Sequence, residues 1–324
     1  MEQVINNTNE IAEFEAQVCK HPDYEVAMHS VYHMLTRSRR IPKSLAILGA
    51  PGTGKTFIAE QVTKSLTATD TPELTTRPYI YINVALCKTP GQLLTEMLFE
   101  LGDIAPSKKD DEVVKLRRIQ TLLTKCHTKL IIIDEIQDLF PKKGLDKRSA
   151  VYKSLKNIKS KLSVPFLYLG TQEAEMMFRV DEQLRDRFWP THYMGQFNCC
   201  TTDDAISFAL VIESLLEKYP RKVKGFSFLN CEIENGVEAY ELKPNHSLLL
   251  RINLATYGLM RRLIDLLTEA LAITTSEEVV DQSVLFDAYN AALNDTHDYN
   301  PFDKDLSIAK VKTRLKQEAL YEVK

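Results

Sequence analysis

The sequence predicts an α/β fold: a mostly parallel sheet covered by helices on both faces, followed by a helical region. Between residues 41 and 197, short apolar segments alternate with helical stretches. The five expected strands are Leu45–Leu48, Tyr79–Val84, Leu130–Asp134, Pro165–Leu169 and His192–Phe197. Such alternation is typical of parallel sheets, because crossover helices join successive strands. After residue 201 the apolar spacing is helical instead.

The composition is that of an ordinary globular protein, with 44% hydrophobic and 26% charged residues in a chain of 324. No apolar run approaches the ~18 residues that span a membrane, so no membrane contact is expected. Six scattered cysteines without a Cys-x-x-Cys pair indicate reduced thiols in a cytoplasmic protein. The net charge of −3 argues against a surface that is basic throughout, but it leaves local basic patches possible.

One stretch matches a phosphate-binding motif at every position. Residues 49–56 fit the P-loop pattern G-x-x-x-x-G-K-[ST] and lie between an apolar strand and a helical stretch. The glycines allow backbone N–H groups to point into one concavity, and the following helix offers its positive end to the same anion. We expect Lys55 to reach the β- and γ-phosphates of ATP and the Thr56 hydroxyl to bind Mg²⁺. The predicted ATP-binding residues are Gly49, Ala50, Pro51, Gly52, Thr53, Gly54, Lys55 and Thr56.

Acidic and polar residues follow two later strands. Asp134 and Glu135 end a buried apolar strand, at the sheet edge where α/β folds bind ligands. We expect Asp134 to hold Mg²⁺ and Glu135 to activate the attacking water. Thr171 ends the next strand, where it could read the γ-phosphate; the alternative role is a helix N-cap, and the two are compatible.

Arginines complete the expected catalytic set. Arg185 and Arg187 flank an aspartate just before the last strand, and each could stabilise charge on a phosphoryl group bound to a neighbouring subunit. The alternative is a surface ion pair with nearby acids. Arg261 begins a helix in the second region and is a candidate phosphate contact; the alternative is a solvated basic turn.

We divide the chain into four parts on these patterns. They are an N-terminal helical extension at 1–40, an α/β nucleotide-binding subdomain at 41–197, a helical subdomain at 198–295 and a C-terminal tail at 296–324. A less regular stretch, Pro220–Pro244, is expected to contain a hairpin-like insertion.

The order of these motifs resembles that of the AAA+ ATPases. The resemblance assigns Walker A to Gly49–Thr56, Walker B to Asp134 and Glu135, sensor 1 to Thr171, the arginine finger to Arg187 or Arg185, and sensor 2 to Arg261. It implies a P-loop NTPase domain with a five-stranded parallel sheet and an α-helical lid subdomain. ATP and Mg²⁺ are the implied cofactors.

A narrower resemblance is to the TniB/TnsC transposition ATPases, including those of CRISPR-associated transposons. It is carried by Ile136–Leu139 after Walker B, by Tyr168–Ala174, by Gln183–Phe188 and by Gly258–Leu263. One position departs from the pattern, since Gln137 stands where relatives often carry histidine.

This resemblance implies an ATPase that oligomerises as a ring or filament around duplex DNA and regulates transposition. It links a target-selection complex, containing a TniQ-type adaptor, to the transposase. Two alternatives stay open: an AAA+ factor that loads a helicase, and a nucleotide-gated scaffold that hydrolyses little ATP.

Two expected loops, residues 85–91 and residues 141–148, are candidates for contact with the DNA backbone in such an oligomer. Both offer cations, and one also offers a hydroxyl at a helix N-terminus, which suits phosphate oxygens. The alternative for the second loop is a solvated surface. Since no base-reading module is recognisable, we expect little sequence preference. The candidate residues are Lys88, Thr89, Lys142, Lys143, Lys147 and Arg148.

Overall fold

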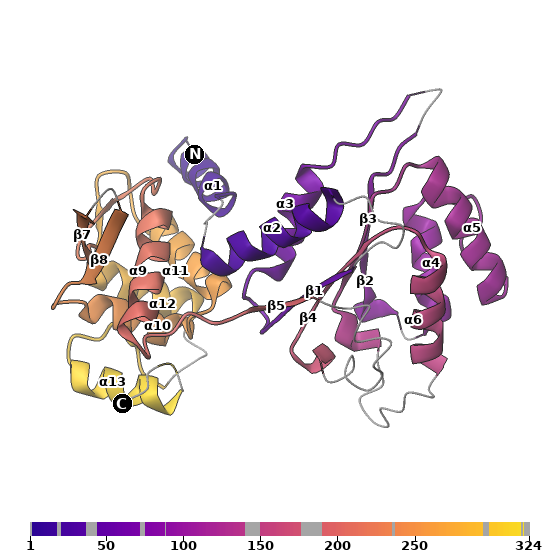
Figure 1. Ribbon diagram of the computed structural model, residues 1–324. Helices are drawn as coiled ribbons and strands as arrows, with labels where there is room; N and C mark the ends of the chain where they lie inside the picture. The colour runs from indigo at the N-terminus through magenta and orange to yellow at the C-terminus, as the bar shows by residue number, and fades with distance from the viewer. Residues whose placement is uncertain are drawn as a thin grey trace. The chain divides into compact units, whose positions relative to one another are not determined.

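The computed structural model describes residues 2–17, 21–36, 44–71, 75–87, 89–139, 150–175, 190–234, 237–293, 298–318 and 320. The chain divides into two compact units (Figure 1): unit 1 comprises residues 1–21 and 196–324, and unit 2 comprises residues 22–195. The stretch expected as an N-terminal extension is split between them. Helix α1 (Glu2–Glu15) belongs to unit 1, and helix α2 (Pro22–Thr36) belongs to unit 2.

Unit 2 is built on a five-stranded sheet in the order β2-β3-β4-β1-β5, in which every pair is parallel. The strands are β1 (Leu45–Gly49), β2 (Tyr79–Asn83), β3 (Leu130–Asp134), β4 (Phe166–Gly170) and β5 (Thr191–Met194). All five expected strands are present, and the expected α/β fold class is confirmed. The last strand is shorter than expected, because the chain beyond Gly195 passes into unit 1.

Side chains alternate between the two faces of the sheet, and on the three central strands, β3, β4 and β1, all of them are buried. In β3, Ile131 and Ile133 pack into one core, and Leu130 and Ile132 pack into the other. The first core is closed by α4 (Pro90–Glu100), α5 (Glu112–Lys125) and α6 (Ala150–Lys161), and the second by α2 and α3 (Lys55–Lys64) (Figure 1). A strand buried on both faces is apolar throughout, which is why these segments stand out in the sequence.

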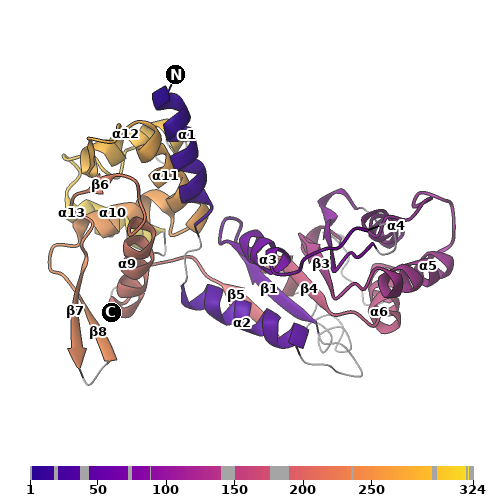
Figure 2. The ribbon, with the colours of Figure 1, turned by 90° about the horizontal axis from the view of Figure 1, so that it is seen from above.

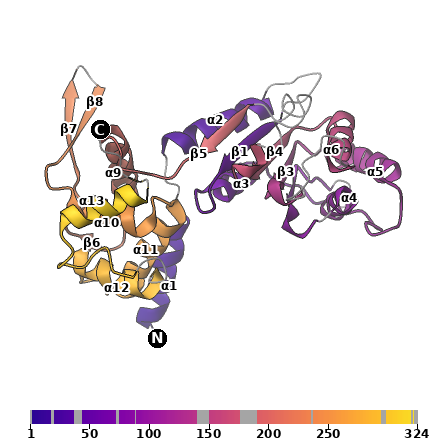
Figure 3. The same cartoon turned by 90° about the horizontal axis from the view of Figure 1, so that it is seen from below.

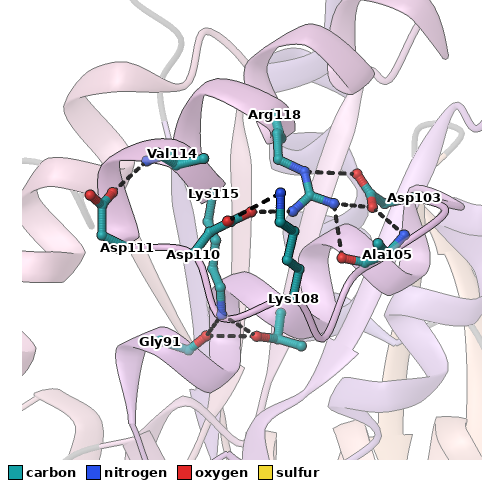
Figure 4. A network of polar contacts seen from close by, with 10 residues as sticks. Gly91, Asp103, Ala105, Lys108, Asp110, Asp111, Val114, Lys115 and Arg118 are labelled. Carbon is teal, nitrogen blue, oxygen red and sulfur yellow. Dashed lines mark hydrogen bonds and ion pairs between the residues drawn. The ribbon is translucent and has the colours of Figure 1, made fainter.

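A polar network fixes the connection between α4 and α5 (Figure 4). The Arg118 guanidinium donates to the Asp103 carboxylate and, at 2.7 Å, to Asp110 Oδ2. Lys115 Nζ donates to Thr95 Oγ1 at 2.7 Å, which ties α5 back to α4. Such bonds hold a connection that lies outside the regular helices and strands.

Unit 1 is mainly helical. Its helices are α1, α9 (Thr202–Leu216), α10 (Ser247–Thr256), α11 (Met260–Ala272), α12 (Gln282–Ala292) and α13 (Ile308–Gln317). Helix α1 lies against α11 (Figure 2), and Phe14 from α1 is 1% exposed within the core of this unit. The Phe14 ring meets the Tyr219 ring edge-on at 5.1 Å. The first helix of the chain is therefore part of the helical unit's core.

Two further segments complete unit 1. Strands β7 (Leu229–Glu234) and β8 (Val237–Leu242) form the antiparallel hairpin expected within Pro220–Pro244, and β6 (Lys222–Val223) pairs with β9 (Val279–Val280). Helix α13 packs beside α10 (Figure 3) and buries Val311 and Leu315 completely. The described part of the stretch expected as a tail thus contributes to the core. Among the described residues, no helix has the length and hydropathy needed to cross a membrane.

Candidate functional site

The P-loop connects β1 to α3 at the carboxyl end of the sheet. Gly52 and Gly54 have φ angles of 84° and 97°, in the left-handed region that favours glycine. Gly54 is the N-cap of α3 and supplies no side-chain cap, so the first N–H groups of the helix are open to a ligand. The Thr53 hydroxyl donates to Ala50 O at 2.9 Å and steadies the turn. This is the backbone arrangement that binds phosphate.

Lys55 places its charge inside the loop. Its ammonium donates to Gly49 O at 2.9 Å and to Ala50 O at 2.8 Å, and the residue is 6% exposed. A positive charge that is shielded from water raises the local preference for an anion.

The Thr56 hydroxyl meets the Asp134 carboxylate, the other residue expected to hold Mg²⁺. Thr56 Oγ1 donates to Asp134 Oδ2 at 3.3 Å, although 78 residues separate them in the chain. A hydroxyl and a carboxylate at one point are ligands that Mg²⁺ accepts, with phosphate and water oxygens completing its shell. Among the described residues, no group of three or more His, Cys, Asp or Glu could hold a metal by itself.

Tyr81 is a further partner of Asp134. Tyr81 lies on β2, and its hydroxyl also donates to Asp134 Oδ2. Burial raises the pKa of Tyr81, and the hydrogen bond and charge of Asp134 raise it further, so the phenol stays protonated and remains a donor at neutral pH. Because Tyr81 pairs with Ile132 in the sheet, Asp134 is its diagonal neighbour on the same face.

Glu135 has an unusual backbone conformation. Its φ angle is 55°, which is costly for a residue with a side chain, and its N–H donates to Asp134 Oδ1 at 2.8 Å. This turn directs the two consecutive carboxylates to different partners, with Asp134 toward Thr56 and Glu135 toward Gln137. Gln137 Nε2 donates to Glu135 Oε2 at 2.5 Å.

Thr171 lies between the P-loop and Walker B because β4 lies between β1 and β3 in the sheet. Its backbone N–H donates to Gln137 Oε1 at 3.0 Å. Its hydroxyl is buried and has no hydrogen-bond partner within the described part of the chain. A buried hydroxyl without a partner is expensive, which points to a ligand at this position.

Several expected site residues lie outside the described residues. These are the two finger candidates, Arg185 and Arg187, and most of the candidate DNA contacts, Lys88, Lys142, Lys143, Lys147 and Arg148. Thr89 is described: it is exposed, and its Oγ1 accepts from Gln92 N at 3.2 Å as the N-cap of α4.

Within unit 1, the two consecutive arginines at the start of α11 differ in environment. Arg262 lies over the Tyr257 ring at 5.1 Å and has a buried Nη1. Arg261 is exposed. The residue chosen from the sequence is therefore the one whose guanidinium faces solvent.

The sequence reasoning did not assign a role to Tyr81 or to Gln137. Tyr81 belongs to an alternating Tyr-Ile-Tyr-Ile strand, which gives no signal beyond a half-buried face. Gln137 was visible only as a departure from the family pattern. Both roles depend on which strands are neighbours, and strand order is not written in a local motif.

Comparison with known proteins identifies the fold and the family. ORC1 of Aeropyrum pernix, solved with DNA, is 16% identical with a TM-score of 0.54, and the match covers 86% of this chain and 67% of that one. Cdc6p of Pyrobaculum aerophilum is 16% identical with a TM-score of 0.55, covering 86% and 70%. ORC2 of Aeropyrum pernix, solved with ADPNP and ADP, is 14% identical with a TM-score of 0.52, covering 85% and 68%.

These likenesses confirm the AAA+ P-loop fold. No curated protein matches the chain. The family model described as bacterial TniB protein matches residues 14–196, which is more than half of the 324 residues. The chain therefore belongs to the TniB family of AAA+ proteins.

Proposed function

We propose that this protein is a Mg²⁺-dependent ATPase that assembles on duplex DNA and regulates transposition. The contact between Thr56 and Asp134, beside the buried Lys55, carries the ATPase part, because it joins a phosphate cradle to a metal ligand. The Thr171 hydroxyl, which is buried without a partner among the described residues, and the Glu135 carboxylate add a phosphate reader and a base beside it.

The residues support a direct displacement at the γ-phosphorus. Lys55 and the N–H groups of the loop hold the phosphates, and Glu135 accepts a proton from the attacking water. The water oxygen bonds to phosphorus as the bond to the β–γ bridging oxygen breaks, which releases ADP and phosphate. Bound through Thr56 and Asp134, Mg²⁺ supplies neutralisation of the charge on the phosphate oxygens.

Two substitutions test this chemistry. Lys55→Ala should weaken binding of a fluorescent ATP analogue, because the buried ammonium is lost. Glu135→Gln should keep that binding and abolish phosphate release. Normal turnover by Glu135→Gln would remove Glu135 as the base. Near-zero turnover by the unmodified protein, even with DNA, would favour the scaffold alternative.

The arginine assignments belong to the same proposal. A finger arginine stabilises charge on the transferring phosphoryl group, so Arg187→Ala should lose hydrolysis and retain nucleotide binding. If only Arg185→Ala has this phenotype, Arg185 is the finger arginine and Arg187 is not. We infer that Arg261 responds to nucleotide, because it is exposed and Arg262 is committed to Tyr257. Arg262→Ala should then cost stability, and Arg261→Ala should change ATP turnover.

DNA binding is supported by membership of the TniB family and by the basic sequence of residues 142–148. The ORC1 relative was solved with DNA, which agrees with this reading. We propose backbone contacts through Lys88, Thr89, Lys142, Lys143, Lys147 and Arg148, in an oligomer that links a TniQ-type target-selection complex to the transposase. Affinity should then depend steeply on salt and little on sequence.

The test is anisotropy with duplex DNA of arbitrary sequence, with and without a non-hydrolysable ATP analogue, followed by negative-stain imaging. ATP-dependent binding with rings or filaments is expected. Lys142→Glu should reduce binding, and Lys153→Glu, on the exposed face of α6, is the matched control. No binding in either nucleotide state would refute the DNA-encircling model. Co-purification with a helicase in place of a transposase would favour the loader alternative.

A further inference from the structure

A single side-chain amide connects the proposed base to the strand that carries Thr171. Gln137 Nε2 donates to Glu135 Oε2 at 2.5 Å, and Gln137 Oε1 accepts from Thr171 N at 3.0 Å. Both ends of the amide are thus occupied, one by the carboxylate expected to act on water and the other by the backbone at the end of β4.

The local structure holds this amide in place. Gln137 lies on the short 3-10 helix η2 (Ile136–Leu139), which is anchored by Ile136 and Leu139, 0% and 2% exposed. Gly170 leaves the space that the amide fills: a Cβ at Gly170 would stand 2.6 Å from Gln137 Oε1 and 2.8 Å from Ile136 Cγ2. These distances are too short for ordinary contact, so any larger residue at 170 would displace the amide.

The Glu135 carboxylate and the Thr171 N–H allow only one orientation of the Gln137 amide between them. A carboxylate accepts hydrogen bonds and a backbone N–H donates them, so the bridging group must donate at one end and accept at the other. A primary amide does this at any pH near neutral, because it neither gains nor loses a proton there. A neutral imidazole also has one donor and one acceptor nitrogen, but a protonated imidazole has two donors.

The link lies beside the buried Thr171 hydroxyl, which has no partner within the described residues. A ligand that hydrogen-bonds to the Thr171 hydroxyl therefore contacts the same residue whose backbone N–H donates to Gln137 Oε1. We propose that Gln137 is a positioning residue: it orients the Glu135 carboxylate and makes that orientation depend on the end of β4 at Thr171. This inference rests on the proposed ATPase function, since it assigns Gln137 its role through Glu135.

The first test is Gln137→Leu, which keeps the approximate size and removes both hydrogen bonds. Hydrogen bonds to charged groups are among the stronger ones, so we expect kcat for ATP hydrolysis to fall about tenfold to a hundredfold. Affinity for a fluorescent ATP analogue should change by less than about threefold, because Lys55 and the P-loop are untouched. Gln120→Leu, on α5, is the control for replacing a glutamine away from the site.

The second test separates positioning from mere support of the fold. Gln137→His should retain most activity at pH 8, where the ring has one donor and one acceptor. The ratio of its kcat to that of the unmodified protein should fall as pH drops through about 6.5, the ordinary pKa of histidine. Gln137→Glu, which offers two acceptors and a second negative charge, should be inactive throughout.

The outcomes distinguish the two proposals. If the unmodified protein binds ATP but does not hydrolyse it, the proposed function fails before Gln137 is examined. If it hydrolyses ATP and Gln137→Leu keeps its kcat or exceeds it, only the positioning role is refuted. A pH-independent activity ratio for Gln137→His would also overturn that role.

Discussion

The turn before α11 gives a sharp prediction about stability. Gly258 has a φ angle of 63°, and a Cβ there would lie 1.6 Å from the Phe197 carbonyl oxygen and 2.6 Å from its carbon. Both are backbone atoms, so no side-chain rotation relieves the clash. Gly258→Ala must displace a segment that is held by Phe197 N donating to Gly258 O at 2.8 Å and Asn253 Nδ2 donating to Phe197 O at 2.9 Å.

The cost combines three effects of known size. A side chain in the left-handed region costs about 1–2 kcal/mol, forced overpacking about 1–3 kcal/mol, and each lost hydrogen bond about 1 kcal/mol. We expect Gly258→Ala to destabilise unit 1 by at least about 4 kcal/mol, which corresponds to a fall in Tm of at least about 10 °C for a unit of this size.

Differential scanning calorimetry with a matched substitution measures this effect. Gly91→Ala introduces the same methyl group on α4, where the nearest atom beyond the adjacent residues and the helix backbone is Thr89 Oγ1 at 3.9 Å. It should leave Tm unchanged or raise it slightly, because alanine suits a helix better than glycine. If Gly258→Ala melts within 2 °C of the unmodified protein, roughly half a kcal/mol on the same scale, the reasoning from close approach is refuted.

Three further predictions follow from the described contacts. Tyr81→Phe removes a donor to Asp134 and should raise the Mg²⁺ concentration for half-maximal ATP hydrolysis about tenfold in a magnesium titration. An unchanged midpoint would show that the Tyr81 phenol does not orient Asp134. Phe14→Ala should destabilise unit 1 by about 3–5 kcal/mol in urea denaturation, whereas Val26→Ala, at a residue 52% exposed, should cost less than about 1 kcal/mol; equal effects would contradict the packing of α1. Burial lowers the pKa of His192, so below about pH 6.5 the unfolded chain takes up a proton that the folded chain resists, and stability falls with acid. The loss of Tm between pH 7.5 and pH 5.5 should therefore be smaller for His192→Val than for the unmodified protein. An equal loss would show that His192 is not the source of the acid sensitivity.

The nucleotide-binding half of the site could be predicted from local sequence. The P-loop is a contiguous motif, so the roles proposed for Lys55 and Thr56 follow from the sequence alone. The buried strands are equally visible, because a strand covered on both faces is apolar without interruption. Asp134 and Glu135 stand out since they end such a strand.

Tertiary structure decided what connects these motifs. The order β2-β3-β4-β1-β5 brings Thr171 between Walker A and Walker B and makes Asp134 the diagonal neighbour of Tyr81. It also lets the Gln137 amide join Glu135 to Thr171, which are 36 positions apart in the chain. Likewise, nothing local distinguishes α1 from α2, yet Phe14 is buried in the helical unit's core and α2 packs on the sheet. Local spacing fixes the period and the apolar face of each element, whereas its partner is set by burial against residues far away in sequence, which no short motif records.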